Sequence, residues 1–370
     1  MSLDDILTIK DLQASAATRL PQAVQEFYDH GAMDMITLRD NEAAYDRYKI
    51  IPRVLRNVAD LDVSVELFGT RVAAPLGISP SAMHCLAHPD GEKATSAAAA
   101  AYNIPMALSL WATTSLEDVA ARGNGNPYIM QLTLFQDRTS ALAVIKRAER
   151  AGYQALFVTV DTPTLGRRLT EMRHGVRLPE HMSFPNMMPQ ADSRTYKEAD
   201  SDPRSFYHAS RDPSNSWESV IPWLKSNTTM DIWLKGVYHP EDALLAAEHG
   251  LAGILVSNHG GRQLDGVPAT LDLLPAIAQA VRGRIPIAVD GGIRRGSDMF
   301  KALALGADFC FVARPILWGL AHSGEDGAKR AIEILLHEFK ATMMLAGCAK
   351  VSDVNKAYLV RCGNKGLSNL

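Results

Sequence analysis

Short apolar runs alternate with amphipathic stretches along most of the chain. The stretches at 138–151, 240–249 and 297–305 carry apolar residues at helical spacing. Apolar runs that alternate with helices are typical of βα units with parallel strands. Eight runs are predicted as strands: PLGIS (75–79), PMALS (105–109), YIMQL (128–132), ALFVTVD (155–161), IWLKG (232–236), GILVSN (253–258), IPIAVD (285–290) and DFCFVAR (308–314).

Eight strands in this alternation predict an α/β fold, a closed (β/α)₈ TIM barrel. An open doubly wound sheet usually has fewer strands, and the G-x-G-x-x-G turn that would open it is missing. We therefore expect one domain over 1–370, with the barrel at 71–350 and a helical preface at 1–70. In the preface, Asp40 to Tyr48 has helical spacing and Pro52 marks a stop.

One stretch breaks the alternation after the fourth strand. Residues 178–217 are rich in Pro, Met, Ser and Asp and show no sustained periodicity. A long insertion at this point of a barrel is more often a lid or mobile loop than a separate domain. The sequence therefore predicts a lid-like loop here.

Polar residues stand at nearly every predicted strand end. The carboxyl ends of barrel strands converge on one face, where active sites are built. A barrel under selection for stability alone would not need a lysine, a histidine, two aspartates and an arginine at one rim. The residues are Ser79, Ser109, Gln131, Thr159, Asp161, Lys235, His259, Asp290 and Arg314.

The loops after strands seven and eight have the composition of a phosphate site. Gly291 and Gly292 allow close backbone approach, and the next helix begins within DGGIRRGSD (290–298). Arg294 and Arg314 are candidate charged clamps for the anion. The sequence therefore predicts an anion site between these two loops.

The loop after strand six, SNHGGRQLDGVPAT (257–270), carries a candidate base and a candidate carboxylate anchor. His259 suits proton abstraction near neutral pH, and Arg262 suits bidentate binding of a carboxylate. Asp161 would orient the imidazole and stabilise its protonated form. Lys235 would place a positive charge beside an electron-accepting ring.

Composition and short motifs limit the kinds of partner, metal site and location that we expect for this protein. The formal net charge of −3 without a basic block argues against nucleic acid. The four cysteines form no C-x-x-C pair, and no spacing of His and carboxylates suggests a metal. No stretch reaches the ~20 uninterrupted apolar residues of a membrane helix, and the acidic first residues do not resemble a signal peptide. The final Ser-Asn-Leu loosely resembles a peroxisomal signal, so we expect a cytoplasmic or peroxisomal protein.

Taken together, these strings resemble the FMN-dependent 2-hydroxy acid oxidase and dehydrogenase family, which includes glycolate oxidase, lactate oxidase and mandelate dehydrogenase. The resemblance runs from about residue 8 to residue 350. It rests on LPQAVQEFYDHGA (20–32), AHPDGE (87–92), TVDTPTLGRR (159–168), LKGV (234–237), SNHGGRQLDGVPAT (257–270), DGGIRRGSDMFKALALGAD (290–308) and EFKATMMLAGC (338–348).

The resemblance implies FMN as the cofactor. Hydroxyl, amide and ammonium groups, with the backbone of one loop, would hold the flavin ring and ribityl chain. The loops after strands seven and eight would hold the phosphate end. The implied cofactor-binding residues are Pro80, Ser81, Ala82, Ser109, Gln131, Thr159, Lys235, Ser257, Asp290, Gly291, Gly292, Arg294, Ala313 and Arg314.

The resemblance also implies roles toward the substrate, a small carboxylic acid. His259 would be the catalytic base, Arg262 the carboxylate anchor, and Asp161 the residue that orients His259. Trp111 and Arg168 would line the substrate side. Relatives are often homotetramers, and reoxidation would use oxygen or another acceptor.

Two positions depart from the family pattern. Phe27 stands where a tyrosine normally bonds the substrate carboxylate, and the neighbouring Tyr28 need not face the site. Thr133 stands where another tyrosine normally contacts the reacting hydroxyl. At roughly 1–3 kcal/mol per unmade hydrogen bond, glycolate or lactate would bind weakly. We therefore expect the flavin site to be intact and the substrate site to be rebuilt.

Three functions remain open at this point. The first is oxidation of an L-2-hydroxy acid that is bulkier or more apolar than glycolate. The second keeps the flavin and the base but acts at an α-carbon that bears nitrogen, as in an amino or imino acid, or belongs to a specialised metabolite. The third is a flavin- or phosphate-binding barrel without redox turnover, which leaves the joint presence of His259, Asp161 and Lys235 unexplained.

Overall fold

The eight predicted strands close into a parallel barrel. The computed structural model describes residues 2–176, 178–187, 212–363 and 366–369. The strands follow one another around the barrel in chain order, and the last, β11, pairs with the first, β4. Each overlaps one predicted apolar run, so the predicted fold is confirmed. They are β4 (Leu76–Ile78), β5 (Met106–Leu108), β6 (Tyr128–Thr133), β7 (Ala155–Thr159), β8 (Asp231–Val237), β9 (Gly253–Val256), β10 (Ile287–Val289) and β11 (Phe309–Val312).

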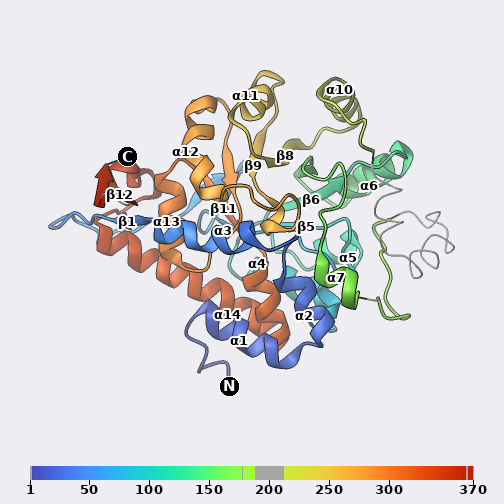
Figure 1. Ribbon diagram of the computed structural model, residues 1–370, viewed down its shortest axis with the longest axis horizontal. Helices are drawn as coiled ribbons and strands as arrows, with labels where there is room; N and C mark the ends of the chain where they lie inside the picture. The colour runs from blue at the N-terminus through green and yellow to red at the C-terminus, as the bar shows by residue number, and fades with distance from the viewer. Residues whose placement is uncertain (1, 177, 188–211, 364–365, 370) are drawn as a thin grey trace.

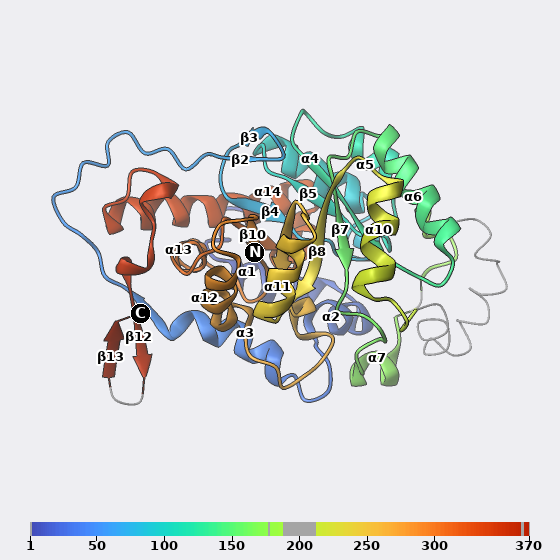
Figure 2. The ribbon, with the colours of Figure 1, turned by 90° about the horizontal axis from the view of Figure 1, so that it is seen from above.

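Helices surround this barrel, as Figures 1 and 2 show. The predicted helices at 138–151, 240–249 and 297–305 correspond to α6, α11 and α13. The long α14 follows β11, and the N-terminal α1 packs against it. The helices after β4 are α4 (Gly91–Ala101), α5 (Leu116–Ala120), α6 (Arg138–Arg150), α7 (Leu169–His174), α10 (Trp217–Asn227), α11 (Pro240–Glu248), α12 (Thr270–Val281), α13 (Gly296–Ala304) and α14 (Arg314–Ala346).

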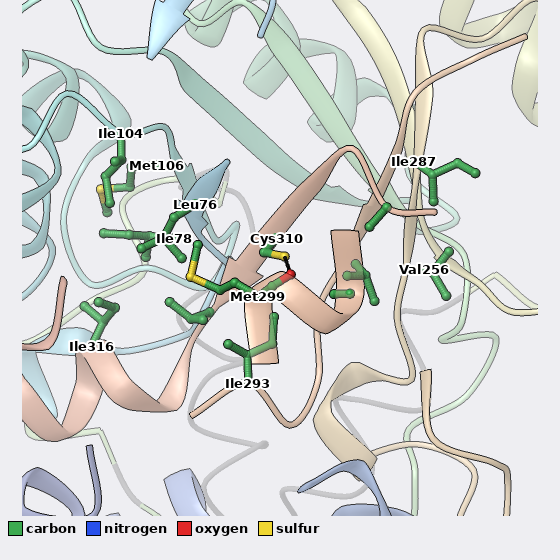
Figure 3. Close-up of a cluster of buried hydrophobic side chains, with 14 of the residues drawn as sticks. Leu76, Ile78, Ile104, Met106, Val256, Ile287, Ile293, Met299, Cys310 and Ile316 are labelled. Carbon is green, nitrogen blue, oxygen red and sulfur yellow. Dashed lines mark hydrogen bonds between the residues drawn. The ribbon is translucent and has the colours of Figure 1, made fainter. Parts of the chain in front are cut away.

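Most residues of the strands are apolar because both faces of the strands are buried. One set of side chains fills the barrel interior, where the Phe157 and Phe311 rings meet edge to face at 5.2 Å. The other set packs against the surrounding helices, as Figure 3 shows for Leu76, Met106 and Ile287. In the same layer the Cys310 thiol contacts the Met299 carbonyl. Alternation of this kind between two buried faces is typical of parallel strands.

The N-terminal region is helical only as far as Asp46. It contains α1 (Ile9–Arg19), α2 (Gln22–Asp29) and α3 (Ile36–Asp46), and α3 corresponds to the helix expected at Asp40 to Tyr48. The rest of the expected helical preface is not helical. It forms short strands instead. β1 (Tyr48–Ile50) pairs antiparallel with β12 (Leu359–Gly363), which continues to β13 (Gly366–Asn369).

A hairpin of β2 (Val65–Leu67) and β3 (Thr70–Val72) follows within the same region. Its Leu67 and Val72 join the side chains that fill the barrel interior. The pairing of β1 with β12 and this hairpin tie residues 48–72 to the barrel. These contacts support the proposal that the chain forms one domain.

Part of the predicted lid lies outside the described residues. Of residues 178–217, the structure describes 178–187 and 212–217, and the latter leads into α10. The last residue of the Ser-Asn-Leu sequence, Leu370, also lies outside them. Among the described helices, none combines the length and hydropathy required to cross a membrane.

The aromatic packing inside the barrel generates a stability prediction. Phe157 has an exposed fraction of 0% and contacts Phe311 and Trp233. We expect Phe157→Ala to lower the free energy of unfolding by about 3–5 kcal/mol, because the change leaves a cavity. Urea unfolding measures this. As a control, Leu7→Ala removes an exposed side chain and should change the value by less than about 0.5 kcal/mol. Equal unfolding midpoints for the two variants would contradict this account of the core.

Candidate active site

A cavity opens at the carboxyl ends of the barrel strands. It encloses about 1240 Å³ of empty space, including the part that is open to solvent. Most residues proposed from the sequence line it, while Asp161 and Ser257 lie behind it and bond to residues that do. The lining residues that were proposed are Phe27, Pro80, Ser81, Ala82, Ser109, Trp111, Gln131, Thr133, Thr159, Arg168, Lys235, His259, Arg262, Asp290, Gly291, Gly292, Arg294, Ala313 and Arg314.

His259 and Asp161 form a pair at one side of this cavity. Nδ1 of His259 lies 3.1 and 3.2 Å from the two carboxylate oxygens of Asp161. His259 has a φ of 57°, an uncommon value for a residue with a side chain, within a 3₁₀ turn at His259–Gly261. Both Gly260 and Gly261 also have positive φ. The two glycines thus permit the turn that directs the imidazole toward Asp161.

The protonation state of His259 follows from its surroundings. Burial, and then the positive charge of Lys235, lower the pKa of His259 below 6.5, and Asp161 opposes this shift only in part. Burial alone would raise the pKa of Asp161, but the charge and hydrogen bond of His259 bring it below its usual value. At pH 7 the site therefore holds a neutral imidazole beside a carboxylate, the arrangement that a general base requires.

Lys235 reaches the same part of the cavity from β8. Its Nζ donates to Oγ of Ser257 at 3.2 Å, and the same oxygen accepts from the backbone N–H of His259 at 3.1 Å. Ser257 follows β9, the strand next to β8. One hydroxyl therefore fixes the lysine and the start of the histidine turn relative to each other.

Arg262 is held by backbone carbonyls and by a carboxylate. Its Nη1 donates to the carbonyls of Phe27 at 2.6 Å and His30 at 2.8 Å, and its Nη2 bonds Glu171 at 2.6 Å. The guanidinium also lies over the Phe27 ring, 4.8 Å from its centre. Arg168 joins this group, since its Nε donates to the Arg262 carbonyl at 3.1 Å.

Glu171 was not identified from the sequence. It lies on α7, inside a stretch without a strong pattern, and it ion-pairs with both Arg262 and Arg168. No spacing in the sequence relates it to Arg262, which is 91 positions away along the chain. Glu171 does not line the cavity, so this ion pair holds Arg262 from outside it.

A strip of hydroxyl and amide groups crosses the floor of the cavity. The Gln131 amide donates to Thr133 Oγ1 at 3.1 Å and to Thr159 Oγ1 at 2.9 Å. Its carbonyl oxygen accepts from the Leu110 N–H at 3.0 Å and from Ser109 Oγ at 3.4 Å. These side chains come from the ends of β5, β6 and β7. They form a hydrogen-bonded polar group suited to the edge of a polar ring.

The part of the cavity around Arg314 and Arg294 is strongly basic. Arg314 Nε donates to the Tyr28 carbonyl at 2.7 Å, and Arg294 Nη2 pairs with Glu42 at 2.8 Å. Burial, followed by the charges of Arg294 and Arg262, lowers the pKa of Arg314 to about 9. Arg294 and Arg314 thus lie where the sequence predicts an anion site, and Arg262 adjoins them, since it shares the His30 carbonyl with Arg314.

Two buried polar atoms at this end have no hydrogen-bond partner in the part of the chain that the structure describes. They are Oδ1 of Asp290 and Nε of Arg294. The other carboxylate oxygen of Asp290 accepts from Ser79 at 2.8 Å. Buried donors and acceptors in this state fit a bound group that carries hydroxyls and an anion.

Gly292 shows why the adjoining loop requires glycine. Its φ is 82°, and a Cβ there would meet the Asn41 carbonyl oxygen at 1.9 Å. The α3 backbone therefore lies directly against the loop after β10. Ala313, before α14, has helical φ and ψ values that lead into Arg314.

The loop after β4 forms another edge of the cavity. Pro80, Ser81 and Ala82 precede Met83, which has a left-handed φ of 59°. Ser81 Oγ donates to the Ser79 carbonyl at 3.3 Å, which holds this short segment against the strand. Its backbone groups therefore face the cavity from one side.

Trp111 forms part of the remaining wall, and two aromatic rings that do not line the cavity support it. Trp111 meets the rings of Phe184 and Phe135 edge to face at 5.4 and 6.1 Å. Tyr28 also lines the cavity, but its hydroxyl donates to the Met83 carbonyl at 2.7 Å. The Tyr28 hydroxyl therefore bonds the backbone, which agrees with the expectation that it need not face the substrate. Further apolar lining residues not proposed from the sequence include Leu165, Ile293 and Leu317.

Comparison with known proteins matches this architecture. A family model described as FMN-dependent dehydrogenase matches residues 16–361. Oxidase FUB9 of Fusarium oxysporum f. sp. lycopersici is 48% identical over 99% of this chain and 94% of its own length. Human 2-hydroxyacid oxidase 1 is 45% identical over 96% of this chain and 97% of its own. A structure of mandelate oxidase with benzoyl-formic acid has a TM-score of 0.86 at 36% identity, covering 96% of this chain and 98% of that one.

The His259 and Asp161 pair generates a pH prediction. Asp161 raises the pKa of His259, so Asp161→Asn should lower that pKa further below 6.5. The imidazole then remains neutral to a lower pH, because protonation requires the pH to fall to the pKa. NMR titration of labelled histidine side chains measures the shift. Asp231→Asn, at the start of β8, is the control and should leave the His259 pKa unchanged. A rise in the pKa of His259 in Asp161→Asn would show that the carboxylate does not act as described.

Proposed function

Because the chain belongs to the FMN-dependent dehydrogenase family, we propose that it oxidises an L-2-hydroxy acid to the 2-oxo acid. The chain is an FMN-dependent oxidoreductase of the 2-hydroxyacid oxidase type. The observation that carries the finer proposal is the convergence of the His259 and Asp161 pair with Arg262 on one cavity. The third function considered above, a barrel without redox turnover, is not what this family assignment supports.

The cavity fits FMN, the cofactor of the family. The unpartnered Asp290 Oδ1 suits a ribityl hydroxyl, and the unpartnered Arg294 Nε suits a phosphate oxygen. Arg314 would add a second guanidinium to the phosphate. Ser109, Gln131 and Thr159 would hold the polar edge of the ring, with the Pro80, Ser81 and Ala82 backbone beside it.

Each protein group at the reacting end then has a defined task. FMN, when bound, supplies the two-electron acceptor. Arg262 would bind the substrate carboxylate, and neutral His259 would accept a proton at Nε2. Asp161 would stabilise the imidazolium that results, and Lys235 would place its ammonium beside the ring. The proton accepted is that of the α-hydroxyl if hydride leaves the α-carbon, or that of the α-carbon if a carbanion forms.

The substrate side supports an acid bulkier or more apolar than glycolate. Phe27 and Thr133 line the cavity without a phenol hydroxyl. Trp111 lines the cavity as well, and the Phe135 and Phe184 rings pack against it. One relative of the same fold has been solved with (S)-mandelic acid, an aromatic 2-hydroxy acid. An apolar side chain on the α-carbon would therefore be favoured over hydrogen or methyl.

Oxidation of an amino or imino acid is the second candidate. It is favoured by the same two positions, because Phe27 and Thr133 provide no phenol to recognise a hydroxy acid. The neutral His259 would serve equally well as a base toward an ammonium group. This alternative keeps Arg262 as the carboxylate anchor.

Anaerobic flavin reduction distinguishes these candidates. We expect bulky L-2-hydroxy acids to bleach the visible flavin band of the holoenzyme, and glycolate to do so weakly. His259→Ala should retain the flavin but reduce it at least ~100-fold more slowly, the usual contribution of a general base. Stopped-flow spectroscopy measures both. Bleaching by L-amino or imino acids alone would favour the second candidate instead.

The homotetramer implied by the family resemblance stays a prediction, as do the cytoplasmic or peroxisomal location and the choice between oxygen and another acceptor. Val54, Leu55 and Leu345 have exposed fractions of 81%, 103% and 78%. Their segments lie together, since the Arg53 N–H bonds the Ala346 carbonyl at 3.0 Å. A second copy covering this surface would bury apolar area.

We therefore expect the purified protein to elute as an oligomer, and Leu55→Asp with Leu345→Asp to shift it toward the monomer. Size-exclusion chromatography with light scattering measures the mass. Leu7→Asp, at an exposed residue outside this surface, is the control. A monomeric wild-type protein would refute the prediction.

A further inference from the structure

A second cavity lies beside the first, between the barrel and α10. It encloses about 940 Å³ of empty space, including the part that is open to solvent. Part of its wall is apolar: Val158 and Leu234 come from β7 and β8, and Val220 and Ile221 come from α10. Figure 2 shows α10 alongside these strands. Nothing in the chemistry described so far uses this space.

The two cavities share three threonines. Thr133, Thr159 and Thr162 line both, and each is buried, with exposed fractions of 5%, 7% and 8%. The hydroxyls of Thr133 and Thr159 both accept hydrogen bonds from Gln131. A threonine whose hydroxyl is fixed in this way has a defined χ1 and keeps its methyl group for its other side. Small side chains with fixed rotamers therefore form the boundary between the cavities.

The position of this boundary relates it to the reacting end. Thr133 and Thr159 are the last residues of β6 and β7, and Thr159 pairs in register with Lys235 on β8. Lys235 lies beside the turn that carries His259. Thr133 and Thr162 line the same cavity as His259 and Arg262, so the side chain of a molecule held by those two residues shares this space with both threonines.

The charges at the second cavity restrict what can enter it. Asp212 and Asp242 line it, and Asp212 pairs with Arg138 at 3.7 Å. Carboxylates at this point would repel a second carboxylate on the ligand. The apolar walls would favour hydrocarbon, since burial of each methylene is favourable.

We propose that the second cavity binds the uncharged hydrocarbon tail of the substrate, which passes between Thr133 and Thr162 while Thr159 stays at the edge of the flavin ring. This inference rests on the proposed function, because it places the carboxylate on Arg262 and the α-carbon at His259. It assigns the substrate to the monocarboxylic acids with an extended aliphatic or slender apolar side chain. Val220 and Val160, both lining the second cavity, become determinants of chain-length specificity.

The test follows anaerobic flavin reduction of the holoenzyme with unbranched L-2-hydroxy acids, from lactate to 2-hydroxyoctanoate. For the wild type, we expect the reduction rate constant divided by the substrate dissociation constant to rise about threefold to fourfold with each methylene that enters the cavity. Val220→Phe should fill the cavity and lower the value for the long acids at least ~10-fold, while lactate is unaffected. Val220→Ala, which removes volume at the same position, is the matched control and should retain the long acids.

A second variant guards against a folding defect in the first. Val160→Phe fills the cavity from the strand side, at a residue with an exposed fraction of 43% that accommodates a larger side chain. Flavin content and the lactate reaction report whether each variant is intact. A flat chain-length dependence in the wild type, or equal losses for short and long acids in both Phe variants, would overturn the cavity assignment and leave the proposed function standing. If no hydroxy acid of any length reduces the flavin, the proposed function fails, and this inference fails with it.

Discussion

The site depends on a close backbone contact between the N-terminal helices and the loop after β9. The Ala32 N–H donates to the Gly261 carbonyl at 2.8 Å, and a Cβ on Gly31 would lie 2.5 Å from that oxygen. The Asn41 and Asn258 amides bond each other reciprocally at 2.9 and 2.7 Å. The turn that carries His259 has positive φ at three successive residues, an arrangement that needs support from its surroundings. The helical preface provides that support, so it is part of the active site.

The same contact orients both arginines that would bind anions. The His30 carbonyl accepts from Arg262 at 2.8 Å and from Arg314 at 3.3 Å, while the Phe27 and Tyr28 carbonyls each accept from one of them. Carbonyls at the C-terminal end of α2 carry the negative end of the helix dipole, which suits cations. One helix end therefore fixes Arg262, the proposed substrate anchor, relative to Arg314, the proposed phosphate anchor, and displacement of α2 would disturb both.

The barrel and most of the site could be predicted from the sequence because each depends on local pattern. Strands that are buried on both faces have continuous apolar runs, and residues such as Lys235, His259 and Asp290 follow from their place at strand ends. The pairing of β1 with β12 could not be predicted, since those strands are short and more than 300 positions apart. The contact of Glu171 with Arg262 and the second cavity behind Thr133 likewise depend on how distant segments pack. Phe27 and Thr133 were recognised as unusual, but only the structure shows which space adjoins them.

Gly236 illustrates how a single backbone irregularity in the barrel positions residues of the candidate site. The pairing of β8 with β9 shifts between Lys235 and Val237, and Gly236 between them has a φ of 102°. A Cβ at this position would meet Cβ of Asp161 at 2.6 Å. Bulges of this kind occur at barrel rims, where they redirect neighbouring side chains. The glycine in LKGV therefore leaves room for Asp161 under His259, while Lys235, one residue earlier, points to Ser257. The charge that lowers the pKa of His259 and the carboxylate that opposes it are thus positioned by one bulge.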